Sequence, residues 1–346
     1  MKALLLSEYR RLELTDLPVP ELGRDEVLVR VAACGICGSD VHGYDGSSGR
    51  RIPPIVMGHE AAGVVEEAGS NAKDFKKGDR VTFDSTVYCG DCVNCRRGDA
   101  NLCDRRQVLG VSCGDYRRNG AFAEFVVVPA RIVHRLPENL SFPEAALLEA
   151  VSVALHAVSL APIKAGDTAL VVGAGTIGLL VQQALAVAGC SRVFVADVDP
   201  TRLKLSQRLG ATANLSSNAD FAAQLSALTD GAGVDVAVEA VGITPAVHTA
   251  INSVRKGGPV VLVGNVTPEV TIPLQVVVSR QIRLQGSCAS SGEYPQAIKL
   301  MSEGKINVKP LITAVAPLEE GPRWFERLYA HEPNLMKVVL EPGARA

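Results

Sequence analysis

Short apolar or alternating segments dominate the first 150 residues of the chain. Stretches such as 26–33 (EVLVRVAA), 61–69 (AAGVVEEAG) and 122–129 (FAEFVVVP) are separated by clusters of Gly, Pro and Asp. Runs of this length, bounded by turn-forming residues, are typical of strands joined by turns. The pattern therefore predicts a mostly β region in the first part of the chain.

The pattern of apolar and polar residues changes near Ala150, where apolar strands begin to alternate with longer helical segments. The expected strands are 168–173, 192–199, 234–242, 259–265 and 282–287, and the expected helices are 178–189, 200–210 and 246–258. Strands and helices in alternation imply a parallel sheet. Residues 292–306 and 321–330 predict two closing amphipathic helices, and residues 342–346 predict a frayed end.

Length and charge narrow the class of protein. A chain of 346 residues with 47% apolar composition favours two domains, because single cores stop growing near ~250–300 residues. The formal charge of -2, from 35 basic and 37 acidic residues, gives no electrostatic reason to expect nucleic acid or a membrane surface as partner. The apolar run at Ala3 to Leu6 is too short for a signal-peptide core or a membrane span, so we expect a cytoplasmic protein.

Four of the nine cysteines fall within residues 88–103 (YCGDCVNCRRGDANLC). They are Cys89, Cys92, Cys95 and Cys103. Short spacers with turn-forming residues let four thiolates converge on one tetrahedral Zn(II). Unrelated buried thiols and an iron–sulfur cluster are the alternatives, and the chain shows no other electron-transfer feature. Four sulfurs complete the coordination of zinc, so this site would stabilise a loop and leave the chemistry to another place.

A second, open metal site is indicated by two other stretches, 34–46 (CGICGSDVHGYDG) and 56–63 (VMGHEAAG). Their candidate side chains are Cys34, Cys37, Ser39, Asp40, His42, His59 and Glu60. One thiolate, one imidazole and one or two carboxylates leave zinc a position for water or a substrate oxygen. A single Cys near a His is more often structural. We interpret Cys34, Cys113, Cys190 and Cys288 as ordinary buried thiols.

A dinucleotide-binding fingerprint follows the first strand of the second region. In TALVVGAGTIGLL, Gly173 makes the turn, Gly175 lets the backbone approach a pyrophosphate, and Gly178 lets helix and strand pack closely. Nineteen residues after Gly178, a strand ends at Asp197, whose carboxylate favours NAD because it would repel the 2′-phosphate of NADP. Arg202 lies five residues further on and could tolerate that phosphate.

These motifs, in this order, resemble the zinc-dependent medium-chain dehydrogenases. The segments that carry the resemblance are GICGSDVH, GHEAAGVVEEAG, KKGDRV, the four-cysteine loop, GAFAEFVVVP, LLEAVSVALHA and VVGAGTIG. The likeness extends over nearly the whole chain and is strongest to the polyol branch, which includes sorbitol, sugar-alcohol-phosphate and threonine dehydrogenases. It implies an α/β fold in which a GroES-like, mostly β catalytic domain (1–150 and 286–346) is interrupted by a doubly wound parallel-sheet Rossmann domain (151–285), with the active site in the cleft between them.

The resemblance also assigns roles to individual residues. The catalytic zinc ligands fall on Cys37, His59 and Glu60, with Glu149 ligating zinc or holding its water, although Ala150 replaces the proline usual after that glutamate. Ser39 and His42 match the proton-relay pair, and a surface-loop histidine is the alternative for His42. The residues matched to cofactor contacts are Gly173, Gly175, Ile177, Gly178, Asp197, Arg202, Val263, Gly264, Asn265, Ser287, Cys288 and Ala289.

The implied function is oxidation of a secondary alcohol of a polyol to the ketone, with one catalytic zinc, one structural zinc and hydride transfer to NAD. Sugar-alcohol-phosphate or threonine dehydrogenase, an NADPH-dependent aldehyde reductase, and a binding role without turnover are the alternatives. Sorbitol itself is in doubt, because Cys288, Ala289 and Gly43 stand where sorbitol dehydrogenases carry an Arg-Tyr pair and a Tyr. Arg50 and Arg51 read as phosphate contacts or as a solvated face. The partners implied are a small alcohol and further copies of the chain, in a homodimer or homotetramer.

Overall fold

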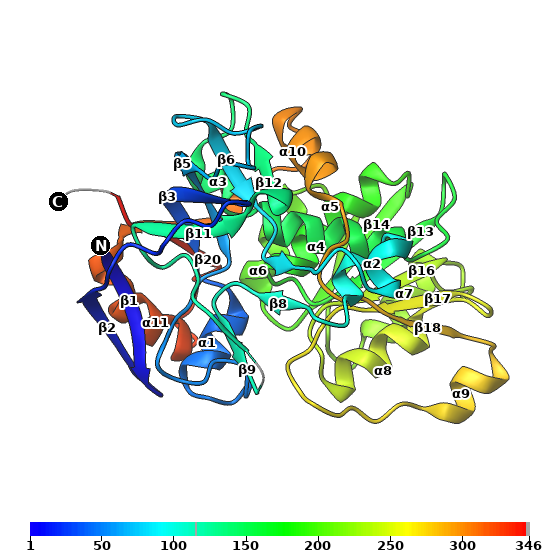
Figure 1. Ribbon diagram of the computed structural model, residues 1–346. Helices are drawn as coiled ribbons and strands as arrows, with labels where there is room; N and C mark the ends of the chain where they lie inside the picture. Colours follow the sequence, from blue (N-terminus) through cyan, green and yellow to red (C-terminus); the bar gives the residue numbers. More distant parts are fainter. Residues whose placement is uncertain (115, 344–346) are drawn as a thin grey trace. The chain divides into compact units, whose positions relative to one another are not determined.

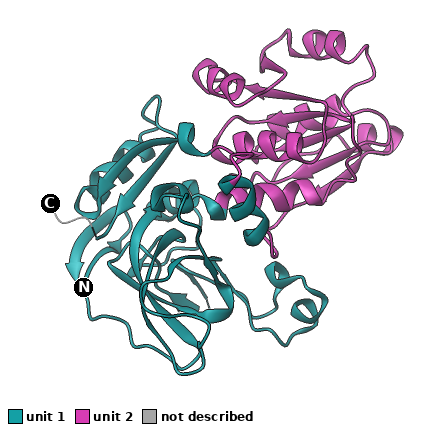
Figure 2. Cartoon of the chain, turned by 90° about the horizontal axis from the view of Figure 1, so that it is seen from above, with its two compact units in different colours: residues 1–149, 294–302, 308–346 teal, residues 150–293, 303–307 magenta. Residues whose placement is uncertain are grey.

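The structure, a computed structural model, describes residues 1–114 and 116–343. Within these residues the chain forms two compact units, shown separately in Figure 2. Unit 1 comprises 1–149, 294–302 and the chain from 308 onward, and unit 2 comprises 150–293 and 303–307. The last three residues of the expected frayed end, 344–346, lie outside the described residues.

The chain crosses between the units at 149/150, 293/294, 302/303 and 307/308, whereas the family resemblance implies boundaries at 150/151 and 285/286. Two contacts explain why the later segments belong to unit 2. Glu293 Oε1 lies 2.7 Å from His156 Nδ1, and the Asn307 N–H donates to Gln183 Oε1 at 2.7 Å. Both attach the segments to helices of unit 2, and no sequence periodicity marks such contacts.

Unit 1 is mostly β, as predicted. Its strands are β1 (Lys2–Glu8), β2 (Arg11–Asp16), β3 (Glu26–Gly35), β4 (Ile55–Val56), β5 (Glu60–Ala68), β6 (Arg80–Phe83), β7 (Thr86–Val87), β8 (Gln107–Val108), β9 (Val111–Cys113), β10 (Tyr116–Arg118), β11 (Phe125–Pro129), β12 (Val133–Arg135), β19 (Ile312–Pro317) and β20 (Lys337–Glu341). Its helices are α1 (Gly38–Tyr44), α2 (Val93–Arg97), α3 (Phe142–Ala145), α10 (Tyr294–Ser302) and α11 (Gly321–Tyr329). The largest sheet has the order β12-β6-β5-β3-β20-β19, and β11 also pairs with β3.

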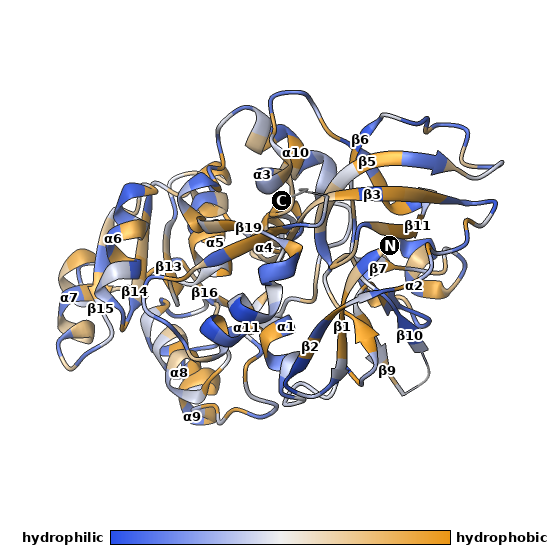
Figure 3. Cartoon of the chain, turned by 90° about the vertical axis from the view of Figure 1, so that its left-hand side faces the viewer, coloured by the Kyte–Doolittle hydropathy of each residue, from blue (hydrophilic) through white to orange (hydrophobic). Residues whose placement is uncertain are grey.

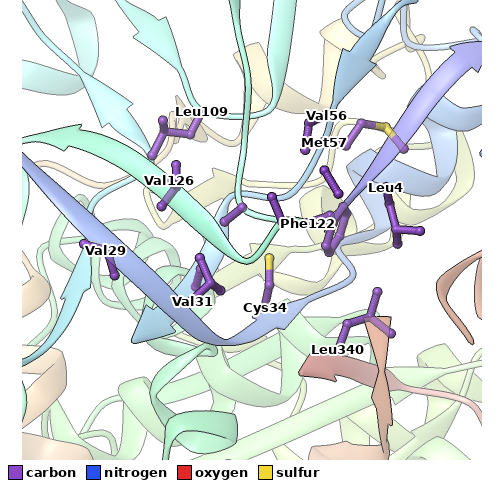
Figure 4. Packing of buried hydrophobic residues seen from close by; sticks show 14 of the residues in the cluster. Leu4, Val29, Val31, Cys34, Val56, Met57, Leu109, Phe122, Val126 and Leu340 are labelled. Carbon is purple, nitrogen blue, oxygen red and sulfur yellow. The ribbon is translucent and has the colours of Figure 1, made fainter. Parts of the chain in front are cut away.

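The core of unit 1 forms between these sheets. Figure 4 shows Phe122, Val31 and Leu340 converging on one side of β3, with the thiol of Cys34 among them. Cys34 is fully buried, so it is the ordinary core thiol that the sequence indicated. Because β3 runs through this core and ends at Gly35, the residues that follow are presented from a rigid strand end.

Unit 2 is a doubly wound parallel sheet, as predicted. Its strands are β13 (Thr168–Val172), β14 (Arg192–Asp197), β15 (Ala213–Ser216), β16 (Val236–Glu239), β17 (Pro259–Leu262) and β18 (Arg283–Gly286), and its helices are α4 (Leu148–Ser159, which starts in unit 1), α5 (Thr176–Val187), α6 (Pro200–Arg208), α7 (Phe221–Leu228), α8 (Thr244–Ser253) and α9 (Leu274–Ser279). The strand order is β15-β14-β13-β16-β17-β18, with every pair parallel. Figure 1 shows helices on both faces. The sequence pattern did not predict β15, α7 or α9.

Hydrophobic residues concentrate in the strands at the centre of each unit, β3 and β13 among them (Figure 3). Within the described residues, the helical stretch Phe142–Ser159 alone has the length and hydropathy of a membrane span. That stretch is 67% buried inside the protein, and the core helices of folded domains pass the same test. Its apolar side chains are therefore already used in packing.

Candidate metal centres and nucleotide site

The open metal site forms where β3 and β5 pair at their ends. Gly35 of β3 lies opposite Glu60 of β5 in the antiparallel register, and Cys37 follows two residues after Gly35 as the N-cap of α1. This pairing brings Cys37 beside His59 and Glu60, although more than twenty residues separate them in the chain. One ligand atom from each of the three lies within 4.8 Å of the others, so the structure brings together three of the predicted ligands.

Two glycines make room for this arrangement. Gly58 has φ +96°, and a Cβ there would meet the Phe122 N at 2.8 Å and the Cys34 Sγ at 2.9 Å. Only glycine adopts that conformation in so tight a space at little cost. A Cβ at Gly35 would meet Glu60 Oε2 at 2.4 Å. The glycine of the GHE motif and the glycine that ends β3 therefore let His59 and Glu60 point into the site.

A buried charged network supports His59. Its Nδ1 lies 3.3 Å from Asp40 Oδ1, which leaves Nε2 for a metal. The Cys37 N–H donates to Asp40 Oδ2 at 3.2 Å, and Arg51 Nη2 donates to Asp40 Oδ1 and to Ser39 Oγ, both at 3.1 Å. Burial opposes ionisation of Asp40, but the charges of His59 and Arg51 outweigh it and hold the pKa of this carboxyl below its usual range.

Glu60 has a cationic partner of its own. Lys337, buried on β20, donates from Nζ to both carboxylate oxygens of Glu60, at 2.7 and 2.9 Å, and to the Ile36 carbonyl at 3.2 Å. Burial opposes the ammonium charge, but Glu60 and Cys37 outweigh it and raise the pKa of Lys337. The carboxylate of Glu60 is therefore held in place before any metal arrives, and a metal would share it with Lys337.

Glu149 lies at the start of α4, outside the group of three ligand atoms. Its Oε1 accepts a hydrogen bond from Ser85 Oγ at 3.5 Å. Burial raises the pKa of Glu149 to about 7, and the neighbouring negative charges of Glu60 and Asp84 add to this against the opposing charge of His59. A carboxyl with these properties suits a group that changes its protonation or its contacts near neutral pH.

The predicted proton-relay residues share one helix. Ser39 and His42 lie three residues apart on α1, and both are exposed. Ser39 Oγ accepts the hydrogen bond from Arg51, whereas the His42 carbonyl accepts from the hydroxyl of Ser47 at 3.0 Å. Residues three apart on a helix are neighbours on its surface. A hydroxyl two residues after the proposed ligand Cys37 and an exposed imidazole therefore lie side by side on α1.

The four-cysteine cluster forms within one loop around α2. One sulfur atom from each of Cys89, Cys92, Cys95 and Cys103 lies within 4.8 Å of the others, and none of the described cysteines forms a disulfide. Backbone N–H groups already point at the sulfurs, from Cys89 to Cys103 Sγ at 3.3 Å and from Cys95 to Cys92 Sγ at 3.5 Å. The N–H groups of Cys95 and Asp104 lower the pKa of Cys92 to about 6.

Both sites fit zinc by the chemistry of their donors. Four thiols whose sulfurs converge to within 4.8 Å match a closed structural site, and thiol, imidazole and carboxylate match a catalytic site that keeps one position open. The residues that would hold the catalytic ion are Cys37, His59 and Glu60, with Asp40 orienting the imidazole from its far side, as carboxylates do around metal-bound histidines.

The three fingerprint glycines of unit 2 have the properties that the sequence predicted for them. Gly173 turns with φ +102°, and a Cβ on Gly178 would meet the Gly173 carbonyl oxygen at 1.8 Å. Among residues 1–114 and 116–343, no heavy atom lies within 4 Å of where a Cβ on Gly175, the N-cap of α5, would be. The turn, the close packing and the open approach to a helix N-terminus are thus all present. Ile177 is half-buried beside them.

Asp197 ends β14 next to this loop. It is buried and accepts hydrogen bonds from the Ala174 N–H at 2.6 Å and the Asp199 N–H at 2.8 Å. Arg202 extends its guanidinium towards Asp199, with Nε 3.6 Å from Oδ2. Asp199 also caps α6 by accepting from the Thr201 N–H at 2.7 Å. The backbone contacts fix the carboxylate of Asp197 beside the phosphate loop.

The remaining predicted cofactor contacts follow β17 and β18, at the same carboxyl edge of the sheet. They are Val263, Gly264, Asn265, Ser287, Cys288 and Ala289. The Ser287 N–H donates to the Leu262 carbonyl at 2.9 Å, and the Ser287 hydroxyl is buried with no hydrogen-bond partner among the described residues. In doubly wound sheets, ligands bind outside the carboxyl ends of the strands.

Sequence reasoning missed several residues around the sites. Lys337 lies nearly three hundred residues from its partner Glu60, so no spacing signals the pair. Glu239 ends β16 fully buried, with Oε1 accepting from the Val241 and Gly242 N–H groups at 2.8 and 2.7 Å. The strand VAVE does end in a carboxylate at the ligand edge, a signal that could have been used.

Two sequence interpretations are corrected. Arg51 is buried and bound to Asp40 and Ser39, so it is neither a phosphate contact nor part of a solvated face, while Arg50 is exposed. Cys113 and Cys288 are only half-buried.

The class of protein follows from the two units taken together. A chain that can hold zinc next to a relay hydroxyl, and that carries a phosphate loop on a parallel sheet, is a zinc-dependent oxidoreductase. Two family models match it, "Alcohol dehydrogenase GroES-like domain" over residues 23–138 and "Zinc-binding dehydrogenase" over residues 176–303. The chain belongs to the zinc-dependent medium-chain dehydrogenase family, in its polyol branch.

Individual relatives cover nearly the whole chain. Sorbitol dehydrogenase of Bacillus subtilis (strain 168) is 34% identical over 349 residues, which cover 99% of this chain and 98% of that protein. D-xylulose reductase A of Aspergillus niger is 36% identical over 336 residues, covering 94% and 93%. The structure of alcohol dehydrogenase TADH from Thermus sp. ATN1 matches with a TM-score of 0.92, 31% identity and 99% of both chains.

The predictions of fold class, family and enzymatic character are therefore confirmed. The chain is a dehydrogenase that acts on CH–OH groups of alcohols with zinc and a nicotinamide cofactor. Similar chains have been solved with NADP in one case and with NADH in another, so the comparisons do not decide between the two cofactors.

Proposed function

We propose that this enzyme oxidises a secondary alcohol of a polyol to the ketone, with NAD as hydride acceptor. The observation that carries the proposal is the open donor set of Cys37, His59 and Glu60, whose ligand atoms lie within 4.8 Å of one another. The two relatives, which are named sorbitol dehydrogenase and D-xylulose reductase A, support it.

The chain's own residues supply positioning and proton transfer. When bound, zinc polarises the alcohol oxygen and lowers the pKa of the hydroxyl. Ser39 accepts the proton that leaves the alcohol and releases its own hydroxyl proton to His42. His42, exposed on the same helix, passes a proton to solvent, a task suited to an imidazole. Asp40 orients His59, and Lys337 retains Glu60 within reach of the site.

The preference for NAD rests on Asp197. Its carboxylate is held beside the phosphate loop by the Ala174 and Asp199 N–H groups, where it can accept from the ribose hydroxyls and repel a 2′-phosphate. The guanidinium of Arg202 could favour NADP, but its Nε lies 3.6 Å from Asp199 Oδ2. The carboxylate of Asp199 therefore partly neutralises this positive charge.

The substrate is an unphosphorylated polyol in this proposal. Arg51 is committed to Asp40 and Ser39, which removes half of the arginine pair that favoured a phosphate ester. Gly43 and Ala289 offer no hydroxyl or guanidinium, so the side chains that would contact the hydroxyls of sorbitol differ here.

We further propose that the protein is cytoplasmic and forms a homodimer or homotetramer. Light scattering after size-exclusion chromatography tests the number of chains in the assembly.

The deciding experiment is an oxidation screen with the zinc-loaded enzyme. Polyols, sugar-alcohol phosphates, secondary diols, threonine and primary alcohols are each supplied with NAD or NADP, and the reduced cofactor is followed by absorbance. We expect turnover of at least one secondary polyol alcohol with NAD. Turnover of primary alcohols alone, or of threonine alone, would contradict the proposal.

Asp197→Asn tests the cofactor part of the proposal in the same screen. Removing the charge that repels the 2′-phosphate should raise the ratio of kcat/KM for NADP over NAD about tenfold. Asp199→Asn is the matched control, because asparagine still caps α6. An unchanged ratio in Asp197→Asn, or an equal rise in the control, would remove Asp197 from its proposed role.

A further inference from the structure

Arg51 is a buried cation that neither the fingerprint motifs nor the proposed chemistry accounts for. Its side chain is 4% exposed, and that of Asp40 is 0% exposed. A single nitrogen, Nη2, donates to Asp40 Oδ1 and to Ser39 Oγ, both at 3.1 Å. A guanidinium is costly to bury unless it is paired and hydrogen-bonded, so this placement needs a reason.

Through Asp40, Arg51 reaches two of the proposed zinc ligands. Asp40 Oδ1 lies 3.3 Å from His59 Nδ1, and Asp40 Oδ2 accepts from the Cys37 N–H at 3.2 Å. Through Ser39, Arg51 reaches the hydroxyl proposed as first proton acceptor. One guanidinium therefore touches both the support of the metal ligands and the relay.

We propose that Arg51 is the positioning residue of the open site, which fixes Asp40 behind His59 and sets the orientation of the Ser39 hydroxyl. The inference rests on the proposed function for the role of Ser39, but its metal-binding part is independent of any substrate. Because Arg51 donates into a lone pair of Ser39 Oγ, the O–H of Ser39 must point away from Arg51, towards its next acceptor.

The backbone around Arg51 is suited to hold a side chain still. Arg51 forms an isolated parallel bridge with Ser112. Ser112 also makes two hydrogen bonds with the next residue, Ile52. The Ile52 N–H donates to Ser112 Oγ at 2.6 Å, and the Ser112 hydroxyl donates to the Ile52 carbonyl at 3.0 Å. The guanidinium is thus delivered from an anchored segment, and little order must be created when metal or substrate binds.

Gly43 of α1 makes the space for the stem of Arg51. A Cβ at Gly43 would meet Arg51 Cγ at 2.0 Å and Cβ at 2.9 Å, distances that no packed pair tolerates. Gly43 is not among the residues with positive φ, so alanine suits its backbone. Gly43→Ala would therefore displace Arg51 without removing a charge or touching a proposed ligand.

The test measures metal binding at the open site and turnover in parallel. The variants are Arg51→Ala, Arg51→Lys and Gly43→Ala, with Arg50→Ala as the matched control, because Arg50 is the exposed neighbour. Cobalt(II) is titrated into protein whose four-cysteine site is filled with zinc, and competition with a chelator gives the affinity of the open site. Circular dichroism and thermal melting establish that each variant is folded.

We expect Arg51→Ala to weaken cobalt binding about 10–100-fold, the usual loss when a residue supporting a metal ligand is removed. Gly43→Ala should weaken it in the same direction, Arg51→Lys should restore part of it, and Arg50→Ala should match the wild type. The pH profile of kcat should shift in Arg51→Ala, because the relay hydroxyl loses its donor, whereas a merely structural role would leave that profile in place.

Wild-type cobalt affinity in folded Arg51→Ala and Gly43→Ala would overturn the proposal. If Arg51→Ala does not fold, Gly43→Ala alone decides. If the wild type oxidises no alcohol, the proposed function fails while the cobalt series still tests the metal-binding role of Arg51. If alcohol is oxidised and neither affinity nor pH profile moves in the variants, Arg51 fails and the proposed function stands.

Discussion

The two cysteine-containing sites of unit 1 are built in opposite ways. The four-cysteine cluster comes from fifteen consecutive residues, 89–103, around one short helix. The open site draws on the end of β3, the start of α1, the start of β5 and β20. In Figure 1 the first three lie at the blue end of the colour scale and β20 lies at the red end. The donors of the closed site are therefore brought together by one loop, whereas those of the open site are brought together by the pairing of strands in the sheet.

The sites also differ in what surrounds the donors. In the cysteine cluster, the backbone N–H groups of Cys89 and Cys95 donate to the sulfurs of neighbouring cysteines. The open site is embedded in buried ion pairs, Arg51 with Asp40 and Lys337 with Glu60. The open site is thus largely organised by protein contacts, whereas a metal would be needed to hold four thiolates together in the closed site.

The largest expected effect follows from removing the thiolate of the open site. Cys37→Ser should lower kcat/KM at least about 10³-fold, since zinc supplies several kcal/mol of transition-state stabilisation. Metal analysis should fall from two zinc ions per chain to one. The melting temperature should change little, because the surrounding ion pairs remain. Retained activity in a variant with one zinc would contradict the catalytic assignment.

An intermediate effect, on stability instead of chemistry, is expected from the closed site. Cys103→Ser should lower the melting temperature by at least about 5 °C, because structural zinc contributes folding free energy. Turnover of the folded fraction at 25 °C should stay within about threefold of the wild type, since a closed site takes no part in catalysis. The comparison is made by thermal melting with and without added zinc and by steady-state assays of the same samples. A loss of activity without a loss of stability would contradict a purely structural role for the closed site.

The smallest effect concerns Glu149. Its pKa is raised to about 7 in the folded, metal-free protein, against an ordinary 4.5. Between these values the folded state keeps a proton that the unfolded state has released, so the free energy of unfolding falls as the pH rises from about 4.5 to about 7. Glu149→Gln should flatten this dependence, measured as urea midpoints of metal-free protein at pH 5 and pH 8.

The same urea midpoints, measured after zinc is added, test whether Glu149 lies near the metal ion. If Glu149 lies close enough to the ion to hold it or its water, the cation lowers the pKa of the carboxyl and the pH dependence of the wild type should weaken on loading. The same slope in wild type and Glu149→Gln, with or without zinc, would show that Glu149 takes no part in the open site.

Local patterns in the sequence predicted much of both sites. The spacing of the four cysteines, the Gly58-His59-Glu60 triplet and the three fingerprint glycines each lie in one short stretch, so their geometry follows from turns and a helix start. The sequence presents Asp40 as a candidate ligand without a supporting role. It indicates phosphate or solvent as the partner of Arg51, because an Arg-Arg pair before two prolines gives no hint of a carboxylate buried eleven residues earlier.

By itself, the sequence determined the alternation of strands and helices, and it indicated the candidate metal donors and the phosphate loop, since all of these depend on periodicity or short spacing. Only the tertiary structure decided which charges meet: Lys337 reaches Glu60 because β20 pairs with β3, and Arg51 reaches Asp40 across the space left by Gly43. Such pairs are selected by the cost of burying an unpaired charge, a free energy that exists only once the core has closed around them.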